Sequence, residues 1–255
     1  MQEAITYDFA PLTLTFFRLG GFMLVAPMFA SRALAPHLRA GITLLLTLLI
    51  FPTVPLPPPG FLLGPVALAG EMLVGLGIGF GAAILLASAE LAGEVLAVQT
   101  GLSGASALDP LTGQGTGVLG QLLRFFVLLL FLVTGGHLVL LEAFAGSYEV
   151  VPAGAAFSLT AGVGEIARMF SLLFVHGLQF AAPIIAAVTV GYMALGVLAR
   201  TSPQLNMLAV AFPLQIGLGL LVLGSSLPVA ATFYAAWPDH AVGLAGRFLL
   251  SLVGG

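Results

Sequence analysis

The chain has 255 residues, of which 60% are hydrophobic and only 7% are charged. An ordinary soluble domain carries roughly a quarter charged residues, and a core of this size cannot bury so much apolar surface. The composition therefore excludes a soluble globular enzyme and a disordered chain, and it favours a polytopic membrane protein. The formal net charge of −3 gives no basic surface for nucleic acid, so no nucleic-acid partner is expected.

The residue types that are missing exclude several chemistries. The chain has no cysteine and no lysine, and all 7 basic residues are arginines. Disulfides, thiolate metal sites, phosphate-binding loops with a lysine and Schiff-base chemistry are therefore excluded. The four histidines are far apart in the sequence, and none makes a helical metal pair with another. We expect no catalytic residue, no metal and no cofactor.

Apolar runs separated by proline, glycine and polar residues predict the membrane helices. They do not alternate as the strands of a barrel would, so an all-α fold is predicted, as a single membrane domain over residues 1–255. Prolines between residues 52 and 59 end the second run, because proline lacks an amide donor. The six major runs cover residues 9–30, 40–51, 62–98, 118–141, 169–199 and 207–236.

Two of these runs have unusual lengths for a simple bundle. Residues 169–199 would extend about 46 Å as a straight helix, whereas residues 40–51 would extend only about 18 Å. The hydrocarbon core is about 30 Å thick. Two explanations are open: the helices are tilted and kinked, with the kink at Pro183, or they pack against other protein subunits rather than lipid. Pro213 and Pro228 are expected to break the sixth run, and residues 241–253 could add one or two amphipathic turns.

Charged side chains interrupt the apolar runs at four positions. A charge in mid-span costs at least about 2.5 kcal/mol, so such a group usually faces protein or a water-filled cavity. These residues either form an ion pathway or pair with each other and with partner helices. We favour pairing, because they do not form the arrangement at the bilayer midplane that a pump needs, although internal partners for all of them are not obvious. They are Arg18, Glu71, Glu90 and Glu94.

Four glycines alternate along the third run. Gly75 with Gly79, and Gly77 with Gly81, form two small-xxx-small pairs. Because glycine has no side chain, a neighbouring backbone can approach closely, which is how helices associate in lipid. The motif fits a subunit interface and packing within the chain equally well.

Residues 101–120 form a glycine-rich polar segment between two apolar runs. Irregular backbone at membrane depth exists only where it is buried in protein or lines water. The segment is therefore either a surface loop or a re-entrant element of a pore. Physical arguments alone favour the surface loop.

Short motifs along nearly the whole chain resemble the family of the flagellar biosynthetic protein FliR and its counterparts in virulence-type type III secretion. The most specific motif is R-x-x-P-Q-x-N, from Arg200 to Asn206, between two apolar runs. Thr100 departs from the large apolar residue that the resemblance leads us to expect. Other matching motifs include Arg18-Leu19-Gly20-Gly21-Phe22, Glu71 with the following glycines, Glu90-Leu91-Ala92-Gly93, Asp109-Pro110, Gly135-Gly136-His137-Leu138, Ala182-Pro183 and Phe212-Pro213-Leu214.

The resemblance implies a core subunit of the type III export gate in the bacterial inner membrane, at the flagellar basal body. Such a subunit assembles with FliP- and FliQ-like subunits and other membrane proteins of the export apparatus. The assembly, in contact with membrane lipid, is a gated channel for unfolded export substrates. The family is not enzymatic, since energy comes from an associated ATPase and the proton motive force. The Gly-Gly-His motif favours the flagellar system over the injectisome, which stays open.

The resemblance also implies roles for three groups of residues. The glycine-rich segment is predicted to be a pore plug, comprising Ala105, Ser106, Asp109, Pro110, Thr112, Gly113, Gln114, Gly115, Thr116 and Gly117. Subunit packing is predicted for Gly75, Gly77, Gly79, Gly81, Arg18, Glu71, Glu90 and Glu94. A cytoplasmic turn is predicted at Arg200, Pro203, Gln204 and Asn206.

A different class of protein, a secondary transporter or a channel for small molecules or ions, is the alternative. It would need broken helices that meet in mid-bilayer, and an inverted repeat. The sequence shows no convincing internal repeat. Purification with FliP- and FliQ-like partners would separate the two classes.

Overall fold

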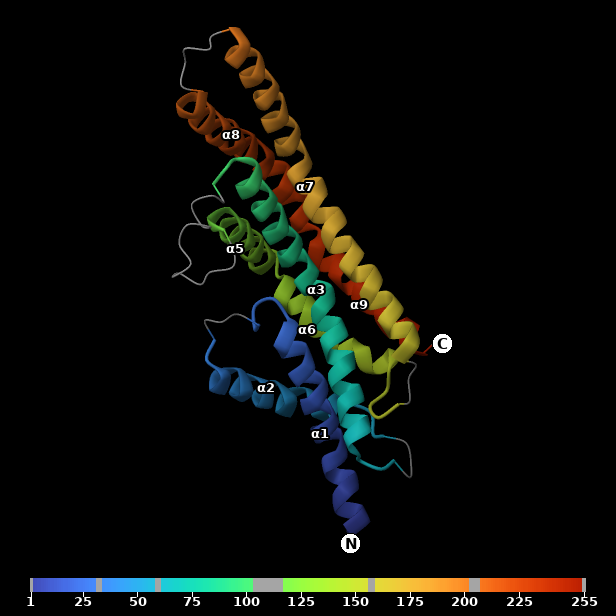
Figure 1. Cartoon of the computed structure of the whole chain (residues 1–255). Coiled ribbons are helices and arrows are strands. Elements are labelled where there is room, and N and C mark those ends of the chain that lie inside the picture. The colour runs from blue at the N-terminus through green and yellow to red at the C-terminus, as the bar shows by residue number, and fades with distance from the viewer. Residues whose placement is uncertain are drawn as a thin grey trace. The chain divides into compact units, whose positions relative to one another are not determined.

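A computed structural model of the chain describes residues 2–30, 34–57, 61–102, 117–155, 159–201 and 207–253. These residues form α-helices and one short 3-10 helix, η1, and contain no strand, so the all-α prediction is confirmed (Figure 1). The elements are α1 (Gln2–Val25), α2 (Pro36–Ile50), η1 (Phe51–Thr53), α3 (Pro65–Gln99), α5 (Val118–Val133), α6 (Gly136–Val150), α7 (Leu159–Thr201), α8 (Met207–Ala235) and α9 (Trp237–Val253).

Four helical segments in the described part of the chain are long and apolar enough to cross a membrane. They are α2 with η1, α3, α7 and α8, and the broken pair α5–α6 makes a fifth if it is counted as one span. The polytopic membrane character predicted from composition is thereby confirmed. α2 is longer than expected, because Pro36 begins the helix at its first turn, where a missing amide donor costs nothing.

The helices group into two compact units. The first contains residues 1–84, 131–171 and 236–255, and the second contains residues 85–130 and 172–235. In the first unit α1 packs on α2, and α6 packs on α9. Its core includes Phe22 and Phe144, whose ring centres are 5.4 Å apart.

α2 has its polarity reversed relative to a helix of a soluble protein. Its buried residues are Thr43 and Thr47, whose hydroxyls donate to the carbonyls of Arg39 and Thr43 one turn earlier, at 2.8 and 2.7 Å. Leucines cover its outer face, and Leu45 and Leu49 are 69% and 70% exposed. Lipid or another protein must cover this face, because water would not stabilise it.

The fourth apolar run differs from the prediction, because it is broken into α5 and α6. Gly135 has a φ of +74°, a left-handed conformation that favours glycine, and its amide donates to Leu132 O at 3.1 Å. Gly136 then packs on the Phe131 ring, where a Cβ would overlap the ring. α6 continues to Val150, well beyond the predicted end of the run at residue 141.

The end of the chain also differs from the prediction. Residues 237–253 form one helix, α9, rather than one or two turns from residue 241. Pro238 and Asp239 in its first turn are typical helix-start residues, since proline suits that turn and an acidic group favours the amino end of the helix dipole. Its buried residues recur with helical spacing, as in Trp237, Ala241, Leu244 and Phe248.

The sixth run is one continuous helix, so the predicted break at Pro213 and Pro228 was wrong. Membrane helices tolerate proline, because neighbouring groups satisfy the freed backbone carbonyls. α7 likewise continues through Pro183 and is 43 residues long, which corresponds to about 64 Å.

Candidate functional site

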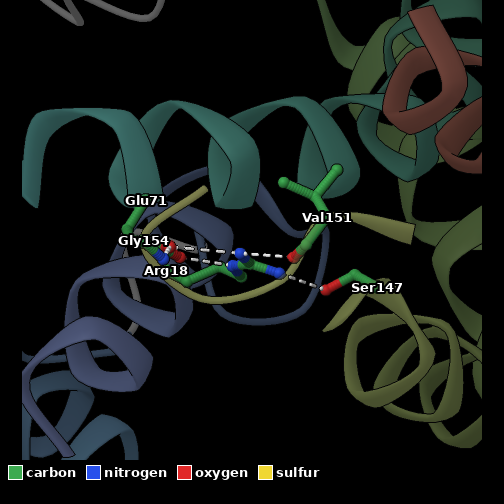
Figure 2. A network of polar contacts seen from close by, with 5 residues as sticks. All are labelled: Arg18, Glu71, Ser147, Val151 and Gly154. Atoms are coloured by element: carbon green, nitrogen blue, oxygen red, sulfur yellow. Dashed lines mark hydrogen bonds and ion pairs between the residues drawn. The ribbon is translucent and has the colours of Figure 1, made fainter. Parts of the chain in front are cut away.

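A buried ion pair joins α1 to α3 inside the first unit (Figure 2). Arg18 Nε donates to Glu71 Oε2 at 2.5 Å, and Arg18 Nη2 donates to Glu71 Oε1 at 3.2 Å. The Arg18 side chain is 0% exposed and the Glu71 side chain is 4% exposed. The two charges are therefore stabilised by each other and by their polar neighbours, as a buried pair requires.

The rest of the Arg18 guanidinium binds the end of α6. Its Nη1 donates to Ser147 Oγ at 3.0 Å, and its Nη2 donates to Val151 O at 2.9 Å. The ring of Tyr148 packs against its face, with Arg18 Cζ 4.0 Å from the ring centre. Hydrogen bonds along the edge and an aromatic ring on the face satisfy a guanidinium well, so this cluster holds three elements together.

Glu71 also holds the turn that follows α6. Its Oε1 accepts the amide of Gly154 at 2.8 Å. Gly154 has a φ of +75°, and a Cβ there would lie 2.5 Å from the ring of Phe61. α6 ends at this turn because Pro152 follows Val151 and disfavours helix before it. We call Arg18, Glu71, Ser147, Tyr148 and Gly154 the buried hub.

One pair of α3 glycines packs on α1. A Cβ at Gly75 would overlap the backbone of Arg18, and a Cβ at Gly79 would lie 2.8 Å from Phe22 O. Gly21 of α1 is in the same close contact, since a Cβ added there would overlap Met72 O. The backbones of α1 and α3 are therefore in contact beside the buried hub, which small residues alone permit.

The other pair of α3 glycines packs on α9. A Cβ at Gly77 would overlap the ring of Phe248, and a Cβ at Gly81 would lie 3.4 Å from Leu244 Cβ. The two small-xxx-small pairs thus serve two different neighbours on two faces of α3. At these positions the structure favours packing within the chain, the second of the two alternatives that the motif left open.

In the second unit, carboxylates of α3 bind the start of α5. Glu90 Oε2 accepts from Arg124 Nη1 at 2.8 Å, and Glu94 Oε1 accepts a hydrogen bond from the amide of Gly117. Between them the helices approach closely, since a Cβ at Gly93 would lie 2.5 Å from Gly120 Cα. We call these residues, Glu90, Gly93, Glu94, Gly117, Gly120 and Arg124, the α3–α5 seam.

The carboxyl end of α3 is held by α7 and α8, also within the second unit. The hydroxyl of Tyr192 donates to Gln99 O at 2.9 Å. Thr100 is buried, and a Cβ at Gly219 would lie 2.2 Å from its methyl carbon. Thr100 is the residue at which the sequence departs from the expected large apolar residue, and here its small side chain packs against Gly219. Gly101 then turns away with a φ of +78°.

Two of the predicted groups lie mostly outside the described residues. Of the predicted plug, only Gly117 is described, and of the predicted cytoplasmic turn, only Arg200 is described, in the exposed last turn of α7. Within the described ranges, no three histidine, aspartate or glutamate side chains gather as metal ligands would.

Comparison with known proteins decides the family. Residues 9–240 match the model of the bacterial export proteins, family 1. The chain belongs to this family. It is 33% identical over 220 residues to the flagellar biosynthetic protein FliR of Pectobacterium carotovorum subsp. carotovorum, covering 86% of this chain and 84% of the relative.

Two further FliR proteins show that the similarity is not confined to one lineage. FliR of Escherichia coli K12 is 30% identical over 210 residues, which cover 82% of this chain and 80% of the relative. FliR of Bacillus subtilis 168 is 31% identical over 223 residues, which cover 84% and 85%. The resemblance to the FliR family is thereby confirmed, and the chain is a membrane protein of the flagellar export family.

In this family member, each of the four charged residues in the apolar runs has a partner within the chain. Arg18 and Glu71 pair with each other, Glu90 pairs with Arg124, and Glu94 binds Gly117. Sequence reasoning missed most of these partners. Of the partners outside this set of four, only Arg124 carried a signal, as the charge near the start of the fourth apolar run, whereas a backbone amide or a serine hydroxyl carries none.

Proposed function

We propose that this chain is a core subunit of the flagellar type III export gate in the bacterial inner membrane, at the basal body. In this proposal it assembles with FliP- and FliQ-like subunits, and with other membrane proteins of the export apparatus, into a channel for unfolded export substrates. The observation that carries the proposal is the match to the export family over residues 9–240, together with relatives named as flagellar biosynthetic proteins.

The exposed apolar surface of α7 supports a protein assembly. Large apolar side chains are exposed along this helix from Val163 to Leu198, a length of about 53 Å as straight helix. Even at a steep tilt of about 40°, that length exceeds a hydrocarbon core of about 30 Å. If lipid alone covered α7, part of this apolar surface would be exposed to water. We therefore infer that another protein covers part of α7.

Purification tests the assembly. The chain should be recovered in a single complex with FliP- and FliQ-like subunits when all three are expressed together. Expressed by itself, it should be disperse, because α7 and α8 would keep their apolar faces uncovered. A monodisperse chain that transports ions or small molecules without those subunits would contradict the proposal.

We propose further that residues 105–117 seal the closed gate. The support is the family's plug at this place and a glycine-rich composition, which lets a loop pack tightly and move at low conformational cost. Deleting residues 112–116 should raise ion conductance and slow growth, while the complex still assembles. A surface loop would tolerate the deletion, so wild-type impermeability of an assembled deletion variant would overturn this role.

A further inference from the structure

A pocket of about 390 Å³ opens between α7 and α8 in the second unit. The two helices are neighbours there, since the rings of His176 and Phe233 have centres 5.4 Å apart. Apolar side chains, among them Phe180 and Phe233, form much of its wall. Four polar residues also line this pocket, which we call the α7–α8 notch: His176, Gln179, Ser225 and Ser226.

The surface around the notch is apolar, and both helices are long and apolar enough to cross a membrane. Val229 at the edge of the notch is 72% exposed, and Gln179 is exposed as well. A polar side chain on the outer face of a membrane helix is costly unless it forms hydrogen bonds, because hydrocarbon offers none. A group of polar side chains at one place on this face therefore indicates a polar partner.

The notch offers hydrogen-bond acceptors on both helices. The hydroxyls of Ser225 and Ser226 donate to Val222 O at 2.9 and 2.7 Å, so their oxygens can still accept from an incoming group. On α7, Pro183 has no amide hydrogen, so Gln179 O receives no hydrogen bond from the residue four positions further on. A group that donates hydrogen bonds would therefore find acceptors on either side of the notch.

The notch also offers a donor, and it lacks a fixed charge. Gln179 Oε1 lies 3.4 Å from His176 Nδ1, and the side-chain nitrogen of Gln179 can donate to an incoming oxygen. The described residues that line the notch include no aspartate, glutamate, arginine or lysine. A charged occupant would lose water without gaining an opposite charge, which is costly. The favoured occupant is therefore neutral and both donates and accepts, as a side-chain amide does.

We propose that the α7–α8 notch receives an asparagine or glutamine side chain from a membrane helix of a neighbouring subunit. This inference rests on the proposed assembly of the chain with other export-gate subunits. Polar side chains that hydrogen-bond across helices are one way in which membrane helices associate. A phospholipid headgroup fits the notch less well, because its phosphate would find no positive side chain among the described lining residues.

A competition experiment measures what the notch contributes to assembly. Natural and Gln179→Leu chains with different tags are expressed together with FliP- and FliQ-like subunits, and the ratio of the two chains is measured in the purified complex. An interhelical hydrogen bond in a membrane corresponds to about a three- to twentyfold preference, so the natural chain should predominate by that factor. Thr232→Val is the control, since it removes an exposed hydroxyl of α8 that donates to Val229 O at 2.8 Å and does not line the notch. Its ratio should be close to that of the natural chain.

Photo-crosslinking identifies the occupant. Benzoylphenylalanine replaces Leu221, which is 68% exposed and lies one turn before Ser225 on the same face of α8. After irradiation of the membranes, mass spectrometry of the product should identify a peptide of a neighbouring subunit with an asparagine or glutamine within about two turns of the cross-link. A product with phospholipid alone, or with a peptide that has no such amide, would overturn the inference.

The outcomes separate this inference from the function on which it rests. If the chain is not recovered with FliP- and FliQ-like subunits at all, the proposed assembly is wrong. If it is recovered but Gln179→Leu competes as well as Thr232→Val does, the assembly stands and the role of the notch is wrong. A Gln179→Glu chain that outcompetes the natural chain would indicate a positively charged occupant and would overturn the amide.

Discussion

The two ionic clusters of this chain use the same residue types in opposite surroundings. In the buried hub, the Arg18 and Glu71 side chains are 0% and 4% exposed. In the α3–α5 seam, the Arg124 and Glu90 side chains are 43% and 20% exposed. In the hub, protein groups replace water around both charged side chains, whereas the seam side chains remain partly exposed.

This difference in burial predicts a difference in task. A buried charge that loses its partner cannot be solvated by water, so separating the hub residues is costly. The hub therefore fixes α1, α3 and the end of α6 relative to one another. A partly exposed pair contributes little, and its groups can exchange partners at low cost. The hub is suited to a fixed scaffold, whereas the seam is suited to a contact that can rearrange.

Removing the Glu71 carboxylate from the hub should have the largest effect on stability and on assembly of the complex. Glu71→Ala leaves the Arg18 charge buried and unpaired, which costs about 3–5 kcal/mol of unfolding free energy. We expect loss of most of the assembled complex, measured by co-purification and by denaturant titration in detergent. Glu142→Ala, at an exposed carboxylate on α6, is the control and should lie within about 0.5 kcal/mol of the natural chain. Equal yields of the two variants would show that the hub is dispensable.

A smaller effect is expected where α1 and α3 touch beside the hub. A Cβ from Gly75→Ala would overlap the backbone of Arg18, which cannot rotate away, and overpacking of this kind costs about 1–3 kcal/mol. Gly20→Ala, on α1 with no atom within 4 Å of its Cβ, should be neutral or slightly stabilising. Thermal unfolding of the two variants in the same detergent measures the difference, and a Gly75→Ala chain as stable as Gly20→Ala would contradict the close contact.

Gly77→Ala should be milder than Gly75→Ala, because its Cβ would meet the Phe248 ring rather than backbone. A ring can shift, so we expect a loss of about 1 kcal/mol, at the low end for overpacking. Gly77→Leu, which no ring shift can accommodate, should prevent correct packing of α9. Limited proteolysis at the carboxyl end measures that packing, and a protected end in the leucine variant would refute the contact.

The smallest effect is expected in the seam. Glu90→Ala breaks a partly exposed pair and should cost only about 0–1 kcal/mol, with less effect at high salt. Denaturant titration at low and high salt provides the measurement. A loss as large as that of Glu71→Ala would remove the distinction between the two clusters.

The sequence could predict the all-α fold and the membrane character, because long apolar runs are one-dimensional signals. It could not predict that Arg18 meets Ser147, since that contact spans 129 residues and depends on the bend after α5. The bend itself has a local signal in Gly135-Gly136, since consecutive glycines favour a turn, and this signal coincides with a family motif.

The length of α9 was underestimated for a different reason. Its apolar residues are spaced for burial on protein rather than for crossing lipid, so a search for long apolar runs overlooks them. The predicted proline breaks in α8 were wrong because a rule for helices in soluble proteins does not hold for a membrane helix, where neighbouring groups satisfy the freed backbone carbonyls. Partners that are backbone groups, such as the Gly154 amide, carry no sequence signal at all.

A double-mutant cycle on the two ion pairs tests the central distinction most directly. Arg18→Met, Glu71→Leu and the double variant give the coupling energy of the hub, and Arg124→Ala with Glu90→Ala gives that of the seam, all from denaturant titration in detergent. We predict a coupling of about 3 kcal/mol or more in the hub, because the apolar double variant removes both buried charges together. The seam should give less than about 1 kcal/mol. A hub coupling below that of the seam would contradict the account.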